Sequence, residues 1–145
     1  SRLWRLRFDE VTDPSRGGTL TMVFEGPASS AVGPKMMDNL TVNDRGQVLI
    51  QEDPGNQAYL AGIYQYDLTT NTVRRVADHD PQRFLTTGAW FDTQDEESSG
   101  IIPVPFLGAG MYLIDVQNHT RLADPELVEK GQLLLLNVPP GQPVN

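Results

Sequence analysis

Three consecutive acidic residues, Asp95, Glu96 and Glu97, stand shortly before an aliphatic pair in FDTQDEESSGII. They form either a solvated turn between strands or part of a pocket for a cation. Calcium takes about six to eight oxygen ligands, many of them carboxylates. Closely spaced carboxylates repel one another unless a cation neutralises them. Because side chains alternate along an extended chain, Asp95 and Glu97 are the pair expected to converge.

A second acidic pair, Glu52 and Asp53, ends the aliphatic stretch VLIQ and precedes Pro54. This pattern places both acids at the end of a strand, on the rim of a β scaffold. Rim positions often carry function, but strand ends are also simply polar, and both interpretations stay open. Asp38 and Asn39 could join the same cluster, although their residue types favour ordinary turn positions.

The two histidines are the side chains that titrate near neutral pH without perturbation. His79 lies between acids in ADHDPQ, and we expect it at the surface. His119 follows an apolar stretch in MYLIDVQNH, so it could contact a substrate or a carboxylate. The chain contains no cysteine, which excludes disulfides, thiolate metal sites and a cysteine nucleophile.

Size and charge limit the possible partners. The chain has 145 residues, 39% of them hydrophobic, which is enough for a core. Its formal net charge of -8, from 19 acids and 11 bases, argues against nucleic acid and anionic membrane surfaces as partners. No apolar run approaches the roughly 20 residues that span a bilayer.

Short strand-like stretches separated by turn residues predict an all-β fold of antiparallel sheets. NDRG at 43–46 and the polar turn at 69–71 suit tight hairpins. The only predicted helical turn is DPELVEKG at 124–131. A recurring unit of about four strands favours two to three blades of a partial β-propeller over 1–138, with a plain sandwich as the alternative. Residues 139–145 are expected to form a tail or linker.

Large aromatic residues are expected to fill the core between sheets rather than to stack on a ligand. These residues are Trp4, Phe8, Tyr66, Trp90 and Phe91. The chain begins within a strand-like stretch, so we expect it to be a segment of a longer protein. An incomplete propeller would leave open strand edges that need a partner.

Two stretches carry a resemblance to a known family. MMDNLTVNDRGQVLIQEDPGN (36–56), and WFDTQDEESSGII (90–102) followed by GMYLIDVQNH, resemble secreted bacterial proteins of the PhoX-like alkaline phosphatase and phytase-like esterase group. The resemblance covers the chain from Leu3 to about Val138. It implies the C-terminal part of a large β-propeller from a secreted or periplasmic protein.

The resemblance also implies a function. Members of this family are calcium-dependent phosphomonoesterases, some of which also hold iron. It implies that Glu52 and Glu97 are metal ligands, with Glu96 as the alternative to Glu97, and that His119 contacts the phosphate ester substrate. The residue pattern adds Asp53 and Asp95 as further candidate ligands. The iron-ligating cysteine and an arginine-glutamate motif of the family are missing from this chain. The segment alone is expected to be inactive, because the blades that supply the other ligands are missing.

The alternative is a non-catalytic propeller segment that binds or scaffolds in a secreted or envelope assembly. Its partners would be the remaining blades of a parent chain or other protein chains at the open strand edges. A tight calcium site distinguishes the hydrolase from the scaffold, because a scaffold has no need for one.

Overall fold

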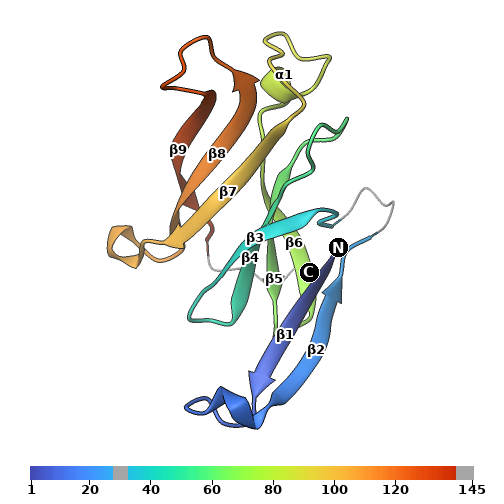
Figure 1. Ribbon diagram of the computed structural model, residues 1–145, viewed down its shortest axis with the longest axis vertical. Helices are drawn as coiled ribbons and strands as arrows, with labels where there is room; N and C mark the ends of the chain where they lie inside the picture. Colours follow the sequence, from blue (N-terminus) through green and yellow to red (C-terminus); the bar gives the residue numbers. More distant parts are fainter. Residues whose placement is uncertain (28–32, 140–145) are drawn as a thin grey trace.

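The computed structural model describes residues 1–27 and 33–139 (Figure 1). Within these residues the chain is almost entirely β, which confirms the predicted fold class. The strands are β1 (Arg2–Phe8), β2 (Gly18–Glu25), β3 (Met37–Val42), β4 (Gln47–Glu52), β5 (Gly62–Asp67), β6 (Thr72–Asp78), β7 (Glu96–Pro103), β8 (Met111–Arg121) and β9 (Glu129–Asn137). The short helical segments are η1 (Pro14–Arg16), α1 (Pro81–Phe84) and η2 (Pro105–Leu107). All strand pairs are antiparallel, in sheets of two, four and three strands.

Turn residues form the two hairpins of the four-stranded sheet. Asn43 Oδ1 accepts hydrogen bonds from the backbone N–H groups of Arg45 and Gln47, both at 3.0 Å, and Gly46 takes a φ of 73°. In the turn between β5 and β6, Asp67 Oδ1 accepts from the backbone N–H of Thr69 at 2.8 Å. Both predicted hairpins are confirmed, because their turns depend on local chemistry.

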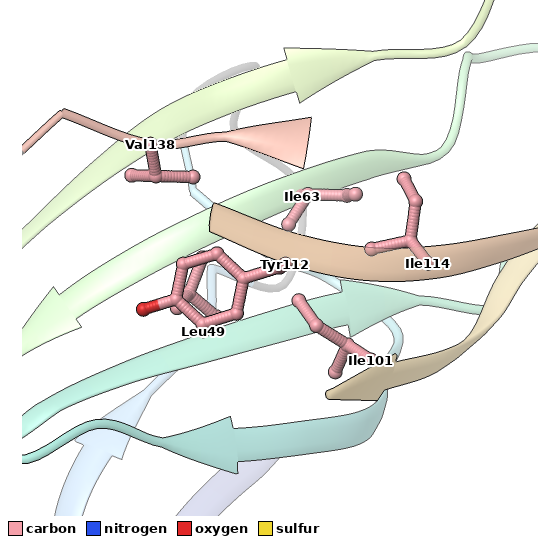
Figure 2. Packing of buried hydrophobic residues seen from close by; sticks show 6 residues of the cluster. All are labelled: Leu49, Ile63, Ile101, Tyr112, Ile114 and Val138. Carbon is pink, nitrogen blue, oxygen red and sulfur yellow. The ribbon is translucent and has the colours of Figure 1, made fainter. Parts of the chain in front are cut away.

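The four-stranded sheet lies between the two smaller sheets (Figure 1). On one face, Leu49 and Ile63 pack against side chains of the β7–β9 sheet and of the residue after it (Figure 2). The partners in this cluster are Ile101, Tyr112, Ile114 and Val138. On the other face, Val48, Ile50 and Tyr66 pack against the β1–β2 hairpin through Leu3, Val23 and Phe24.

This arrangement explains the sequence of the two central strands. Val48 and Leu49 are neighbours that point to opposite faces, yet both are buried, at 3% and 0% exposure. A strand covered on both faces is apolar along its length instead of alternating. The stretches VLIQ in β4 and IYQY in β5 have this character.

One predicted element is wrong, and the three short helical segments were missed. Residues 124–131 form no helix: they hold the turn between β8 and β9, where the Leu122 N–H donates to the Val128 carbonyl at 3.0 Å. Pairing of Glu129 with Arg121 then extends β9 into the predicted helical turn. The helix that does form is α1, where the Asp80 side chain accepts from the Gln82 N–H at 2.9 Å.

The aromatic prediction holds for one residue only. Tyr66 is buried at 1% exposure, and its hydroxyl donates to the Val23 carbonyl at 2.7 Å. Trp4 and Trp90 are 50% and 67% exposed, and Phe8 and Phe91 are also exposed. The prediction is wrong for these four residues, because Trp4 and Phe8 lie on the uncovered face of β1 and the other two follow α1 outside any sheet.

No helix in the described part of the chain has the length and apolar character needed to cross a membrane. Of the predicted tail, residues 140–145 lie outside the described ranges. The domain boundary at 138 therefore stays a prediction.

Candidate metal centre

Three carboxylates from two sheets meet at one place. One oxygen each of Asp38, Asp53 and Glu97 lies within 4.8 Å of the other two. Asp38 belongs to β3, Asp53 directly follows β4, and Glu97 belongs to β7. Asp38 is exposed, whereas Glu97 is buried. We expected Asp38 in a turn, but it lies in β3, and the pairing of β3 with β4 brings it to the cluster.

The alternation of side chains decides which acid after VLIQ reaches Glu97. Leu49 and Gln51 face the β7–β9 sheet, and the Gln51 amide donates to Ser98 Oγ at 3.0 Å. Asp53 continues this face. Glu52 points elsewhere: its two oxygens accept from the backbone N–H groups of Lys35 at 2.7 Å and Gly62 at 3.0 Å.

Glu52 is thus a buried structural acceptor, at 1% exposure. Both of its carboxylate oxygens already hold backbone donors, and it is not among the three clustered acids. The geometry favours Asp53 over Glu52 as a cation ligand. Asp53 is an even number of residues from Leu49, so the sequence places both side chains on the same face. Selecting Asp53 also requires knowing which face of β4 meets β7.

Burial and the neighbouring acids both make Glu97 harder to ionise. Burial raises the pKa of Glu97 to about 7, with further contributions from a hydrogen bond with Asp53 and from the charges of Asp53 and Asp38. The charge of His119 lowers the pKa of Glu97. A carboxylate that resists ionisation beside other carboxylates becomes easier to ionise when a cation binds.

The three acids fit a hard cation. Two oxygens that bind one calcium ion at about 2.4 Å are at most about 4.8 Å apart, which the cluster satisfies. Oxygen ligands without sulfur or nitrogen suit calcium, magnesium or manganese rather than softer metals. Asp38, Asp53 and Glu97 are therefore the residues able to hold such an ion.

Glu96 points to the other face of β7. Its Oε1 accepts from the Ala61 N–H at 3.1 Å and lies 3.8 Å from His79 Nδ1. Glu96 is 1% exposed, and this burial raises its pKa to about 7. Asp95, just before β7, is partly exposed, and its carbonyl accepts from the His119 N–H at 3.0 Å. Neither Asp95 nor Glu96 is among the clustered acids.

The surface position expected for His79 is wrong. The side chain is buried at 7% exposure, with its ring centroid 5.6 Å from that of Phe84. Burial lowers the pKa of His79 to about 4. Contacts distant in the sequence bury this side chain. The His79 N–H donates to the Ala61 carbonyl at 3.2 Å, and α1 packs against the ring through Phe84.

His119 is engaged by a partner on the neighbouring strand. Its Nδ1 lies 2.8 Å from Glu129 Oε2, and this hydrogen bond raises the pKa of His119. The carboxylates of Asp95 and Glu97 add to the same effect. The imidazole is therefore oriented beside the acidic cluster by Glu129.

A cleft of about 780 Å³ lies between β6 with α1 and the β8–β9 pair. His79, Phe84, Asn118 and an ion pair of Lys130 with Asp92 at 2.7 Å help to line it. None of the three clustered acids lines this cleft. Sequence reasoning missed it, because its walls come from strands whose packing could not be read from local pattern.

Comparison with models of protein families, with curated proteins and with solved structures found no match.

Proposed function

We propose that this chain is a segment of a calcium-dependent phosphoester hydrolase built on a β-propeller, with Asp38, Asp53 and Glu97 as carboxylate ligands. The observation that carries the proposal is the convergence of these three acids. They come from the two stretches, 36–56 and 90–102, on which the resemblance to PhoX-like phosphatases rests. Of the two ligands implied by that resemblance, Glu97 lies in the cluster, whereas Glu52 does not and its neighbour Asp53 takes that place.

The antiparallel four-stranded sheet supports the propeller part of the proposal, since a blade is a sheet of this kind. Its packing between two further sheets agrees with a stack of neighbouring blades. A secreted or periplasmic location belongs to the same proposal and follows from the resemblance.

Bound calcium would neutralise phosphate charge and polarise the phosphorus–oxygen bonds. The protein's part is to hold three carboxylates together and to exclude water from Glu97. His119, which Glu129 orients, would contact the phosphate ester beside them. Three carboxylates are fewer than the six to eight oxygens that calcium takes, so further ligands would come from backbone carbonyls, water, substrate or other blades. We do not extend the proposal to iron, because the chain offers no cysteine.

Calorimetric titration with calcium, after treatment with a chelator, tests the metal site. Because this segment supplies only three carboxylates of the full ligand set, we expect it to bind calcium weakly, with a dissociation constant of about 10⁻⁴–10⁻³ M. Asp53→Asn and Glu97→Gln should each weaken binding at least about tenfold, since each removes a charged ligand. Asp44→Asn, at an exposed turn position, is the matched control and should bind like the wild type.

Glu52→Gln separates the two acids that follow VLIQ. Its calcium affinity should stay close to that of the wild type, because Glu52 holds backbone N–H groups. A chain without calcium binding at millimolar concentration, or a Glu97→Gln variant that binds normally, would refute the metal site.

Hydrolysis of p-nitrophenyl phosphate in calcium buffer tests the reaction. The 145-residue chain should release no more nitrophenol than its Glu97→Gln variant, because the blades that would complete the calcium site beyond its three carboxylates are missing. Activity of the chain that Glu97→Gln abolishes would contradict the need for further blades.

A non-catalytic scaffold is the second candidate. The β1–β2 and β7–β9 sheets expose large apolar side chains, as an interaction module would. Absence of calcium binding together with protein association would favour this function over the hydrolase.

A further inference from the structure

The cleft of about 780 Å³ lies between two sheets of the chain, and none of the three clustered acids lines it. One wall comes from β5, β6 and α1, through side chains that include Ile63 and Phe84. The other wall comes from β8 and β9, through Ile114, Val116 and Leu136. Its volume falls within the roughly 300–1,000 Å³ of small-molecule sites, whose walls are mostly apolar with a few polar groups.

His79 brings an unpartnered polar group to this cleft. The residue lines the cleft at 7% exposure, and neither imidazole nitrogen is hydrogen-bonded within the described part of the chain. Glu96 does not supply the bond, because its Oε1 lies 3.8 Å from His79 Nδ1 and its Oε2 is itself buried without a partner there. Since buried polar groups nearly always have a partner, the imidazole has hydrogen-bonding capacity available for a ligand.

The imidazole is able to present a nitrogen to the cleft. Both nitrogens are buried in the present orientation of the ring. A half turn about the Cβ–Cγ bond exchanges Nδ1 with Cδ2 and Nε2 with Cε1, and no hydrogen bond of the ring opposes this turn. Burial lowers the pKa of His79 to about 4, so at neutral pH the ring is neutral and offers one N–H donor and one acceptor. The Phe84 ring, with its centroid 5.6 Å from that of His79, adds an aromatic wall.

The charged side chains of the cleft already have partners of opposite charge. The acids that line it each lie beside a base: Asp92 with Lys130 at 2.7 Å, Asp80 with Arg83 at 3.7 Å, and Asp78 with Arg75. A charged ligand would therefore lose hydration in the cleft without gaining an unpaired opposite charge, which disfavours its binding. These pairs favour a ligand that carries no charge.

We propose that this cleft binds an uncharged molecule of the phenol class, whose ring packs on the apolar walls and whose hydroxyl hydrogen-bonds to His79. A hydroxyl both donates and accepts, so it can serve either nitrogen of the imidazole. A phenol stays uncharged at neutral pH, because its pKa is about 10. The site uses neither calcium nor the three clustered acids, so this proposal and the proposed function can fail separately.

NMR titration of the chain with phenol tests the site, with a chelator present so that calcium cannot contribute. The chain has two histidines, so the ring signals lost in His79→Phe are those of the His79 imidazole. Phenol should shift these signals and saturate with a dissociation constant of about 1 mM, as expected for so small a ligand. Toluene, benzoate and benzylamine should each bind at least about tenfold more weakly, because toluene lacks the hydroxyl and the other two are charged.

Two substitutions place the binding in the cleft, with binding followed on the ligand signals. His79→Phe keeps an aromatic ring and removes an unpartnered polar group, so the variant should fold and should bind phenol no better than toluene. Val116→Phe fills part of the cleft and should weaken the binding of both ligands. Phe106→Leu is the matched control, since Phe106 is 82% exposed outside the cleft, and it should bind phenol like the wild type.

Phenol that leaves the His79 signals unchanged up to its solubility limit would overturn the proposal. Equal affinities of the wild type for phenol and toluene would overturn it as well, and so would tighter binding of benzoate or benzylamine. A Val116→Phe variant that binds phenol like the wild type would place the binding elsewhere. If circular dichroism shows that His79→Phe is unfolded, His119→Gln assigns the His79 signals instead, and the comparison of the four ligands on the wild type decides.

Discussion

Leu49→Ala is expected to lower the free energy of unfolding by about 2–5 kcal/mol, the usual cost of a large cavity in a core. Leu49 has 0% exposure and lies in the cluster that joins the middle sheet to the β7–β9 sheet (Figure 2). Ile63 on the neighbouring strand and Tyr112 from the opposite sheet belong to the same cluster. The walls belong to paired strands of two sheets, so they can collapse only partly into the space that the leucine leaves.

Urea unfolding followed by circular dichroism measures this change. The matched control is Leu127→Ala, because Leu127 is 61% exposed in the turn before β9. Its effect should stay within about 0.5 kcal/mol, as for most surface substitutions. A Leu49→Ala variant as stable as this control would contradict the packing of the two sheets.

Glu96→Gln is expected to stabilise the protein at alkaline pH and to leave its stability nearly unchanged at acidic pH. Burial raises the pKa of Glu96 from 4.5 to about 7, so the folded state favours the protonated side chain. The contribution of that protonated form is complete below pH 4.5 and disappears as pH rises through about 7. Glutamine stays neutral at every pH, so its advantage should reach on the order of 2–3 kcal/mol above pH 7.

The experiment compares urea unfolding of both proteins at pH 5 and pH 8, with a chelator present so that bound metal cannot contribute. Glu126→Gln, at an exposed position, is the control and should behave alike at both pH values. A Glu96→Gln variant whose advantage is equal at pH 5 and pH 8 would contradict the raised pKa of Glu96.

His79 changes the stability with pH in the direction opposite to Glu96. Burial lowers the pKa of this histidine from 6.5 to about 4, so its contribution to stability is complete above pH 6.5 and is lost as pH falls toward 4. Glu96 and His79 therefore oppose each other between pH 4.5 and pH 6.5. At pH 5 and pH 8 the folded His79 is neutral, because its pKa is about 4, so comparing each variant with the wild type at the same pH removes its contribution from the Glu96 measurement.

Elements fixed by local chemistry could be predicted from the sequence. Asn43 and Gly46 define one hairpin by their own hydrogen bonds and dihedral angles, wherever the hairpin lies in the molecule. The stretch 124–131 shows the limit of this reasoning. Asp124 and Pro125 have helix-starting types, but pairing with β8 extends β9 to Glu129 and outweighs that preference.

The candidate site could not be predicted without knowing which faces of the sheets pack together. Both Glu52 and Asp53 could be predicted at a strand end, but only the packing of β4 against β7 selects Asp53. In the same way, alternation correctly separates Glu96 from Glu97, yet Glu96 is buried as well because the other face of β7 is also covered. Asp38 reaches the end of β4 through the predicted β3–β4 hairpin, in which Met37 pairs with Glu52, but its turn-favouring residue type argued against its place in the cluster.

The middle sheet also determines how the molecule can come apart. Because each side of β4 is covered by a different neighbour, detachment of either flanking sheet would expose Leu49 or Ile50 to water. Neither end of the chain can unfold independently without weakening the centre, so the three sheets should share one cooperative transition. Thermal or chemical stress would then remove the carboxylate cluster and both outer faces together rather than one at a time.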